Sequence, residues 1–342
     1  MQQKKMVNTM SNKILRVVAF TALILSFVVV MVGAYTRLTD AGLGCPDWPG
    51  CYGHYAVPKS QDQLQQAQMQ YPQLPVESEK AWTEMIHRYL AGTLGLLVIL
   101  LSLSLLVKRL RGNTQLWCLP MVLITLIFFQ AALGMWTVTL KLLPVVVMGH
   151  LLGGMLIVAC LSRVNLEINH FSKTASVRWR PWLILGLAIL FIQIALGGWV
   201  SSNYAGISCI GFPQCNGLWV PKLHFSQGFN LFSALGTNYQ GGVLEHEVRV
   251  TIQFIHRVGA LITAVYLFSL GMAILTRGVA GFRVIGLILS ILVVVQFVLG
   301  IINVTHLLPL AIAVAHNGVA ALLFAVLFSA LYFIKRENSH AA

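Results

Sequence analysis

Residues 84–110 read EMIHRYLAGTLGLLVILLSLSLLVKRL and are the clearest indication of the fold class. No charged residue falls between Arg88 and Lys108, so 19 consecutive residues are uncharged. A run of about 20 apolar residues is long enough to cross the hydrocarbon core of a bilayer as a helix. The stretch therefore predicts a transmembrane helix over about 85–107.

Similar apolar runs lie on both sides of this stretch. The first is long enough to span the membrane, and no convincing small-residue cleavage site follows it, so we interpret it as a helix and not as a signal peptide. The seven further predicted spans are about 16–35, 116–138, 144–162, 182–201, 252–275, 284–303 and 308–334.

The composition agrees with eight membrane spans. Of the 342 residues, 57% are hydrophobic and only 10% are charged, whereas a soluble domain carries roughly 25% charged residues. Eight spans of about 20 residues would use about half of the chain. The composition excludes a disordered chain, a nucleic-acid-binding domain and an ordinary soluble enzyme.

The net charge of +13 is interpreted as a topology signal. Of the 23 basic residues, 15 fall on the side that carries both termini and 8 on the other side. Basic residues accumulate on the cytoplasmic side of membrane proteins. We predict cytoplasmic termini, large outer loops at about 36–84 and 202–251, and no nucleic-acid partner. The short N-terminus has no Arg/Ser-rich transit peptide, which favours a bacterial inner membrane.

The two halves of the sequence repeat each other in parallel. AGLGCPDWPGC (41–51) matches AGISCIGFPQC (205–215), EMIHR (84–88) matches QFIHR (253–257), and QAALG (130–134) matches QFVLG (296–300). The offsets are 164, 169 and 166 residues. Such steady offsets indicate duplication of a four-helix unit. We predict an all-α membrane protein of two tandem four-helix bundles, related by a pseudo-twofold axis along the membrane normal.

Four histidines lie toward the outer ends of the even-numbered spans. They are His87, His150, His256 and His316. Ionisable residues inside a membrane are expensive and are candidates for function. Two histidines per bundle match the need of one haem for two axial ligands on facing helices. Packing histidines and a zinc site are the alternatives, but the wide spacing of the pairs disfavours zinc.

One carboxylate distinguishes the two repeats. Glu84 lies three residues before His87, and Gln253 lies three residues before His256. An i,i+3 spacing places each pair on one helix face. A carboxyl group beside a haem is suited to proton transfer, so the N-terminal bundle is predicted to do chemistry while the other carries electrons. The alternative is that Glu84 only marks the water-facing start of its helix.

Arginines and cysteines complete the candidate site. Arg88 and Arg257 each follow a histidine, and Arg37 follows the first span. They are candidates to bind haem propionates, although snorkelling to the headgroups is an equal alternative. Four cysteines lie in the outer loops, where disulfides persist. Pairing within each loop, Cys45–Cys51 and Cys209–Cys215, is the simplest of three connectivities, and a redox-active pair is the alternative.

Taken together, these features resemble the haem A synthase family over nearly the whole chain. The resemblance rests on the eight spans, the tandem units, the E-x-x-H-R motif, a histidine in each even span, and TRLTDAGLGCPDWPGC (36–51) in the first outer loop. It implies an oxidoreductase that converts a methyl group of haem O to a formyl group by successive hydroxylation, giving haem A for terminal oxidases. Dioxygen and water are both open as the oxygen source.

The resemblance also assigns roles to residues. It implies that Glu84 is catalytic, that His87 and His150 bind the substrate haem in the N-terminal bundle (15–163), and that His256 and His316 bind a haem b cofactor in the C-terminal bundle (182–334). Residues 1–14, 164–181 and 335–342 form a cytoplasmic N-terminus, linker and tail. The expected partners are the lipid bilayer, an unknown electron donor and the farnesyl transferase that produces haem O.

Two other classes of function are open to the sequence. A di-haem membrane cytochrome would relay electrons from a quinol to an outer partner and would not need Glu84. A transporter would also fit a tandem repeat. However, the sequence contains no Gly/Pro-interrupted spans at matching mid-membrane positions, so we expect the enzyme.

Overall fold

The computed structural model describes residues 2–112, 114 and 116–335, and every regular secondary-structure element within them is a helix. Eight of its helices are long and apolar enough to cross a membrane. These eight are α1 (Gln2–Leu38), α3 (Ser78–Leu110), α4 (Cys118–Thr139), α5 (Pro144–Ile168), α6 (Arg180–Ser202), α8 (His246–Arg277), α9 (Ala280–Thr305) and α10 (Leu310–Ala330).

Four short elements accompany the long helices: α2 (Gln61–Gln70), α7 (Phe225–Gly228) and the 3₁₀ helices η1 (Val177–Trp179) and η2 (Leu331–Phe333). α2 begins after the N-cap residue Ser60. The Ser60 side chain accepts a hydrogen bond from the backbone N–H of Gln63, and the Gln63 side chain accepts one from the backbone N–H of Ser60. This reciprocal pair of bonds is a capping box.

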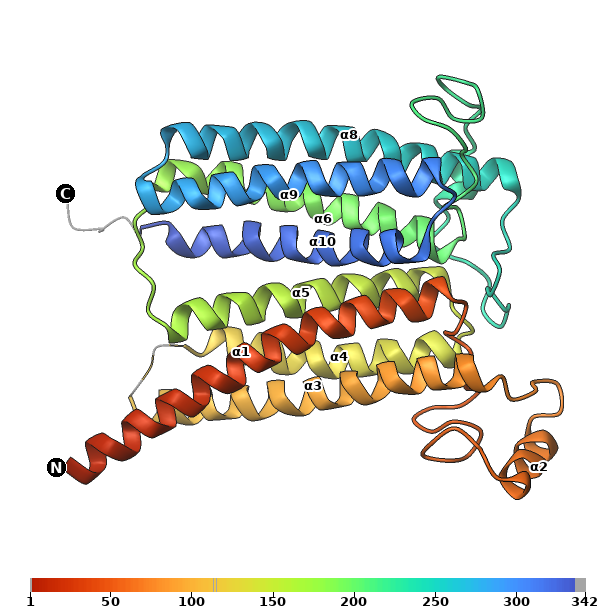
Figure 1. The fold of residues 1–342 in the computed structure, drawn as a ribbon, viewed down its shortest axis with the longest axis horizontal. Helices are drawn as coiled ribbons and strands as arrows, with labels where there is room; N and C mark the ends of the chain where they lie inside the picture. Colours follow the sequence, from red (N-terminus) through yellow and green to blue (C-terminus); the bar gives the residue numbers. More distant parts are fainter. Residues whose placement is uncertain (1, 113, 115, 336–342) are drawn as a thin grey trace.

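The predicted tandem arrangement is confirmed. In the N-terminal bundle α1 contacts α3, α3 contacts α4, α4 contacts α5 and α5 contacts α1. In the C-terminal bundle α6, α8, α9 and α10 make the corresponding contacts. Figure 1 shows the two bundles side by side, with both long loops (39–77 and 203–245) at one end and the chain termini at the other. We call these the loop end and the terminus end.

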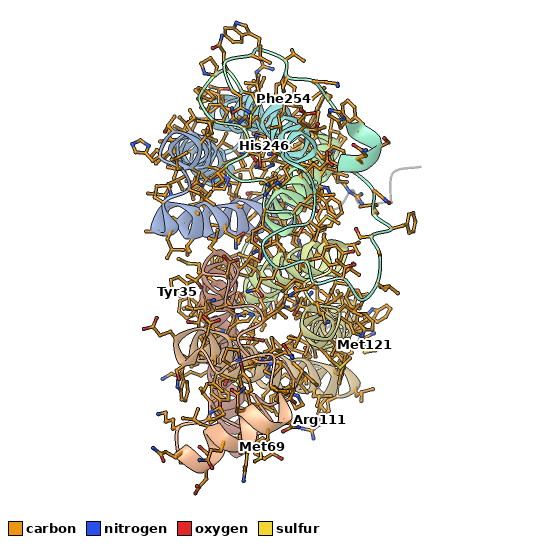
Figure 2. All side chains as sticks on the ribbon, turned by 90° about the vertical axis from the view of Figure 1, so that its right-hand side faces the viewer. Tyr35, Met69, Arg111, Met121, His246 and Phe254 are labelled. Atoms are coloured by element: carbon orange, nitrogen blue, oxygen red, sulfur yellow. A yellow bond between two sulfur atoms is a disulfide. The ribbon has the colours of Figure 1, made fainter. Side chains whose placement is uncertain are left out.

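The helix contacts between the two bundles follow the pseudo-twofold symmetry that relates the two halves of the sequence. α5 contacts α10, its own counterpart, and the contact of α1 with α10 is matched by that of α6 with α5. Small residues allow this approach: a Cβ on Gly198 of α6 would lie 3.0 Å from Leu151 of α5, and one on Gly318 of α10 would lie 3.2 Å from Met31 of α1. Glycines serve this purpose in membrane helix packing. Figure 2 views the two bundles from the loop end, with their side chains drawn as sticks.

Two helices extend further toward the loop end than the apolar runs predicted. α3 begins at Ser78 and α8 at His246, whereas the predicted spans begin at about 85 and 252. The added turns pack on the cysteine loops: Ala81 is buried with Cys45 and Cys51. Val250 is buried with the cysteines of the second loop. These turns are partly polar because they leave the apolar core, so hydropathy did not include them.

Candidate functional site

The four predicted histidines share one large cavity, and each lies on the helix that the sequence indicated. His87 is on α3, His150 on α5, His256 on α8 and His316 on α10. All four line a cavity of about 1860 Å³ that runs through both bundles. Among the described residues there is no group of three or more His, Cys, Asp or Glu that could hold a metal ion. The histidines therefore act in pairs if they bind iron.

The N-terminal pair has the separation that a metal ion between two imidazoles requires. The ring centroids of His87 and His150 lie 6.5 Å apart. A metal–imidazole bond is about 2 Å long, and the ring centre lies about 1 Å behind the bonding nitrogen, so opposed imidazoles have centroids about 6 Å apart. In the described chain the Nδ1 atoms of both rings are buried without a hydrogen-bond partner. The pair fits the two axial ligands of one haem.

Each histidine ring is packed against a glycine of the neighbouring helix, where a side chain would collide with it or crowd it. The four contacts obey the repeat, because the glycines on α1 and α6 correspond to each other, as do those on α4 and α9. The pairs are Gly33–His87, Gly134–His150, Gly197–His256 and Gly300–His316, with distances from the added Cβ to Cε1 of 2.8, 3.4, 3.1 and 3.3 Å.

Glutamine side chains lie beside the histidines, and they differ between the halves. Gln193 Nε2 lies 3.0 Å from His256 Nδ1, and Gln296 Nε2 lies 3.2 Å from His316 Nε2. In the N-terminal half, Gln130 occupies the position of Gln296 but packs on Gly153 instead, and its Nε2 has no partner among the described residues. The sequence analysis identified Gln130 and Gln296 as repeat markers without indicating this role.

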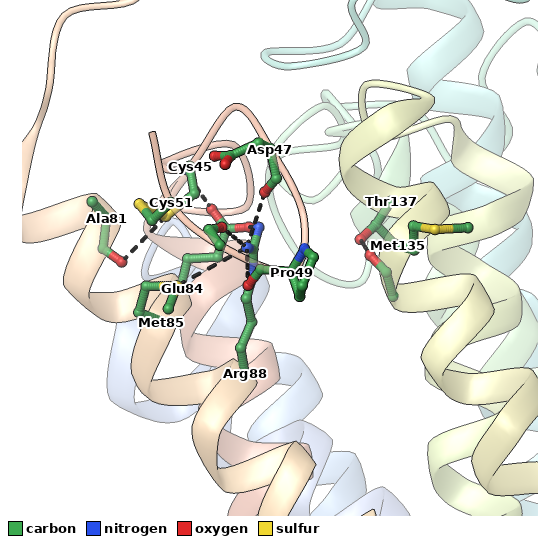
Figure 3. Close-up of polar contacts among 12 residues, drawn as sticks. Cys45, Asp47, Pro49, Cys51, Ala81, Glu84, Met85, Arg88, Met135 and Thr137 are labelled. Atoms are coloured by element: carbon green, nitrogen blue, oxygen red, sulfur yellow. Dashed lines mark hydrogen bonds and ion pairs between the residues drawn. A yellow bond between two sulfur atoms is a disulfide. The ribbon is translucent and has the colours of Figure 1, made fainter. Parts of the chain in front are cut away.

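Glu84 is buried against the first cysteine loop. Its side chain faces the loop beside Arg88 in Figure 3, and the residue is 4% exposed. Oε2 accepts the backbone N–H of Cys45 at 2.8 Å, and Oε1 pairs with the guanidinium of Arg88. Glu84 and Arg88 both line the cavity that contains His87. The carboxylate is thus close to the candidate haem site and held at both oxygens.

Arg88 also anchors the loop itself. Its Nη1 donates to the carbonyl oxygens of Asp47 at 3.0 Å and Gly50 at 2.5 Å. Gly44 allows the close approach of the loop to α3, since a Cβ there would lie 2.6 Å from the backbone of Lys80. The disulfide Cys45–Cys51 closes this loop, and Figure 3 shows it beside Ala81 of α3.

The second loop repeats this anchoring with one substitution. Arg257 Nη1 donates to the carbonyl oxygens of Gly211 at 2.8 Å and Gln214 at 3.2 Å, which are the counterparts of Asp47 and Gly50. Its Nη2 donates to the carbonyl of Cys209, not to a carboxylate. The disulfide Cys209–Cys215 closes this loop. The guanidinium groups of Arg88 and Arg257 are therefore both hydrogen-bonded to the loops. Propionate binding by these two arginines stays a prediction.

The third predicted arginine lies at the junction of the bundles. Arg37 donates from Nη2 to the carbonyl of Ser201 on α6 and lies 3.9 Å from the centre of the Tyr204 ring. Arg249 donates to the Tyr204 carbonyl at 3.4 Å. The Nε atoms of both arginines and the Tyr204 hydroxyl are buried without partners in the described chain, and all three residues line the cavity. This junction cluster fits carboxylate groups of a haem, and the sequence analysis did not identify Arg249 or Tyr204.

Comparison with known proteins gives a consistent result. The chain matches COX15-CtaA, described as cytochrome oxidase assembly protein, over residues 16–328. It is 44% identical to a protein of Shewanella oneidensis named heme A synthase, over 93% of this chain and 96% of that protein. Proteins with the same name from Agrobacterium fabrum (31% identical, 90% of this chain and 86% of that protein) and Caulobacter vibrioides (26% identical, 91% and 93%) also match.

Proposed function

Because this chain belongs to the COX15-CtaA family of cytochrome oxidase assembly proteins, we propose that it is a haem A synthase, the membrane oxidoreductase that converts haem O to haem A. The residue that supports this function most directly is Glu84. It is a buried carboxylate in the cavity of the His87–His150 pair, and a glutamine stands at its position in the other half.

The two bundles have different roles in the proposed reaction. His87 and His150 would hold the substrate haem, and His256 and His316 would hold a haem b cofactor. A haem iron ligated by two histidines supplies electron transfer there. Gln193 and Gln296 support this division, because they lie within hydrogen-bond distance of the cofactor ligands. Outer partners of this kind fix the orientation of a ligating imidazole.

Glu84 is placed to take up a proton released as the methyl group is oxidised, while the electrons leave to the oxidant, which is dioxygen or an external redox partner. The backbone N–H of Cys45 and the guanidinium of Arg88 hold its two oxygens, so the carboxylate is oriented before substrate binds. The first loop contributes Trp48 and Pro49 to the cavity wall. The loop thereby limits the access of water to the reacting carbon, and exclusion of water strengthens the interactions within a site.

The protein is a multi-pass membrane protein, and its orientation forms part of the proposal. The long loops face the outside of a bacterial inner membrane and both termini face the cytoplasm, as the 15 basic residues on the terminus side support. The farnesyl transferase that produces haem O is the proposed donor of substrate, because an apolar haem is best passed directly between membrane proteins. A further redox partner exchanges electrons with the cofactor haem.

Pigment analysis tests the function. The full chain is produced in a host that supplies haem O, and its haems are extracted and separated. We expect haem A to be formed and haem b to remain with the purified protein. Haem O left unconverted by the intact chain, with haem b bound, would contradict the synthase and favour a cytochrome that only relays electrons.

A further inference from the structure

The two bundles differ in the room that they leave beside their histidine pairs. Gly92 on α3 corresponds to Leu261 on α8, and Ala131 on α4 corresponds to Phe297 on α9. All four residues line the cavity. At both positions the N-terminal bundle therefore has a small residue where the C-terminal bundle has a large apolar one.

The space at these small residues is open. A Cβ added to Gly92 would meet nothing within 4 Å. From there the cavity wall continues along α3 through Leu96 to Ile99. Ile99 lies 12 residues beyond His87, which is about 18 Å along a helix axis. The cavity thus extends from the histidine pair toward the terminus end, between α3 and α4.

Further toward the terminus end than this space, the helices of the C-terminal bundle approach each other more closely than those of the N-terminal bundle. A Cβ on Gly286 of α9 would lie 2.6 Å from the carbonyl oxygen of Gly271 on α8, so these two helices meet backbone to backbone. The matched residues in the N-terminal bundle are Ser102 and Pro120, whose side chains exclude such an approach. α3 and α4 are therefore held apart where α8 and α9 are in contact.

The space between α3 and α4 is apolar and opens to the surface that faces lipid. Leu96 is 60% exposed and Phe128 64% exposed, and both also line the cavity. The same cavity contains the buried, unpartnered Nδ1 atoms of His87 and His150, so the apolar space is continuous with a site that has ligand-binding groups.

We propose that this slot, bounded by Gly92, Leu96, Ile99, Ile127, Phe128 and Ala131, binds the isoprenoid side chain of the substrate haem and admits that chain from the bilayer. The inference rests on the proposed function, because haem O carries a long isoprenoid chain where haem b has only a vinyl group. Transfer of such a chain from lipid into an apolar slot buries no polar group, and close packing in the slot adds van der Waals contacts. The cofactor haem b needs no such space, and the C-terminal bundle has the larger Leu261 and Phe297 at the corresponding positions.

The test gives the N-terminal slot the side chains of the C-terminal bundle. The full chain with Gly92→Leu and Ala131→Phe is purified with its resident haem and titrated separately with haem O and with haem b. We expect the affinity for haem O to fall at least tenfold, while added haem b binds as in the unmodified chain and the resident haem is retained. Thr93→Leu is the matched control, since Thr93 is exposed and does not line the cavity.

Unchanged binding of haem O by the double variant would overturn the slot, and so would an equal loss of both haems. If the double variant does not accumulate, Gly92→Leu alone carries the same test, because the space at Gly92 is open. The outcomes separate the two proposals. An unmodified chain that binds haem O but makes no haem A contradicts the function, whereas haem A formation with normal haem O binding by the double variant contradicts the slot alone.

Discussion

The N-terminal and C-terminal bundles anchor their loops with the same arginine and differ in what that arginine pairs with. Arg88 donates to the carbonyls of Asp47 and Gly50 and pairs with Glu84. Arg257 donates to the corresponding carbonyls and to that of Cys209. The loop is thus held in both halves, with or without a carboxylate. A carboxylate takes part in this anchoring only in the N-terminal half.

The histidine pairs of the two bundles also differ in their hydrogen-bond partners. His256 and His316 each have a glutamine amide within hydrogen-bond distance of one ring nitrogen, whereas no glutamine contact is found for His87 or His150 among the described residues. The Nδ1 atoms of His87, His150 and His316 all lack a partner in the described chain. Val29 stands where the C-terminal half has Gln193. Fixed imidazoles suit a resident cofactor, and less restrained ones suit a haem that must enter and leave. Four pairs of matched variants test this difference between the halves.

The largest effect is expected from Glu84→Gln, which makes the N-terminal half resemble the C-terminal half. Loss of a general base costs about 100-fold or more in rate, so conversion of haem O should fall by at least that factor while resident haem is retained. The haem A to haem O ratio in extracts measures it. Gln253→Glu is the control and should leave conversion within about twofold. Normal haem A formation by Glu84→Gln would remove this residue from the mechanism.

The second-largest difference between the two halves is expected when each disulfide is removed. Each closes a ring of the same sequence separation, six residues, and contributes about 2 kcal/mol in the chain-entropy model. The Cys45→Ser, Cys51→Ser double variant should lower conversion about tenfold, because the Cys45 N–H holds Glu84. The Cys209→Ser, Cys215→Ser variant should lose similar thermal stability and little conversion. Equal losses of conversion would show that both loops act only through stability.

Replacing each motif arginine with lysine is expected to have a smaller effect. A lysine keeps the charge but cannot donate to a carboxylate and two carbonyls in the same geometry. Arg88→Lys should slow conversion about fivefold, roughly the loss of one charge-assisted hydrogen bond, with KM for haem O little changed. Arg257→Lys should leave the rate nearly intact. A change confined to KM would assign Arg88 to substrate binding instead of the positioning of Glu84.

The smallest effect is expected from Gln193→Leu, which removes the amide beside His256. The outer partner of a ligating histidine tunes the metal, so the midpoint potential of the resident haem should shift while haem content and conversion stay close to normal. A spectroscopic redox titration measures the shift. Val29→Gln is the reciprocal variant and should leave that potential unchanged. An unaltered potential in Gln193→Leu would exclude the amide as a tuning group.

The sequence predicted the helices and their pairing well because both follow from local patterns. Uncharged runs such as 89–107 place a span, and offsets near 166 place one half on the other. Helix ends were less accurate, since Ala81 and Val250 are buried by loops and not by lipid. Burial by a loop depends on tertiary contacts that hydropathy does not describe.

The candidate site was only partly predictable for a related reason. Glu84 and the histidines stand out because ionisable residues are rare within the spans. Arg249 lies in HEVR at a helix start, where charge is ordinary, and its contact with Tyr204 joins residues 45 positions apart. Such contacts depend on how loops and helices are placed against each other. The slot beside Gly92 likewise requires the helix positions, because a glycine in a membrane helix more often serves packing.

The contact of α5 with α10 has a consequence for the origin of this chain. A helix that meets its own counterpart across a pseudo-twofold axis reproduces the isologous interface of a homodimer, and the matched contacts of α1 with α10 and α6 with α5 have the same property. A single four-helix subunit could have formed this assembly with itself, but any mutation would then have changed both sites. Fusion of the two copies released each site from the sequence of the other, and Glu84 opposite Gln253 is a difference that an identical pair could never carry.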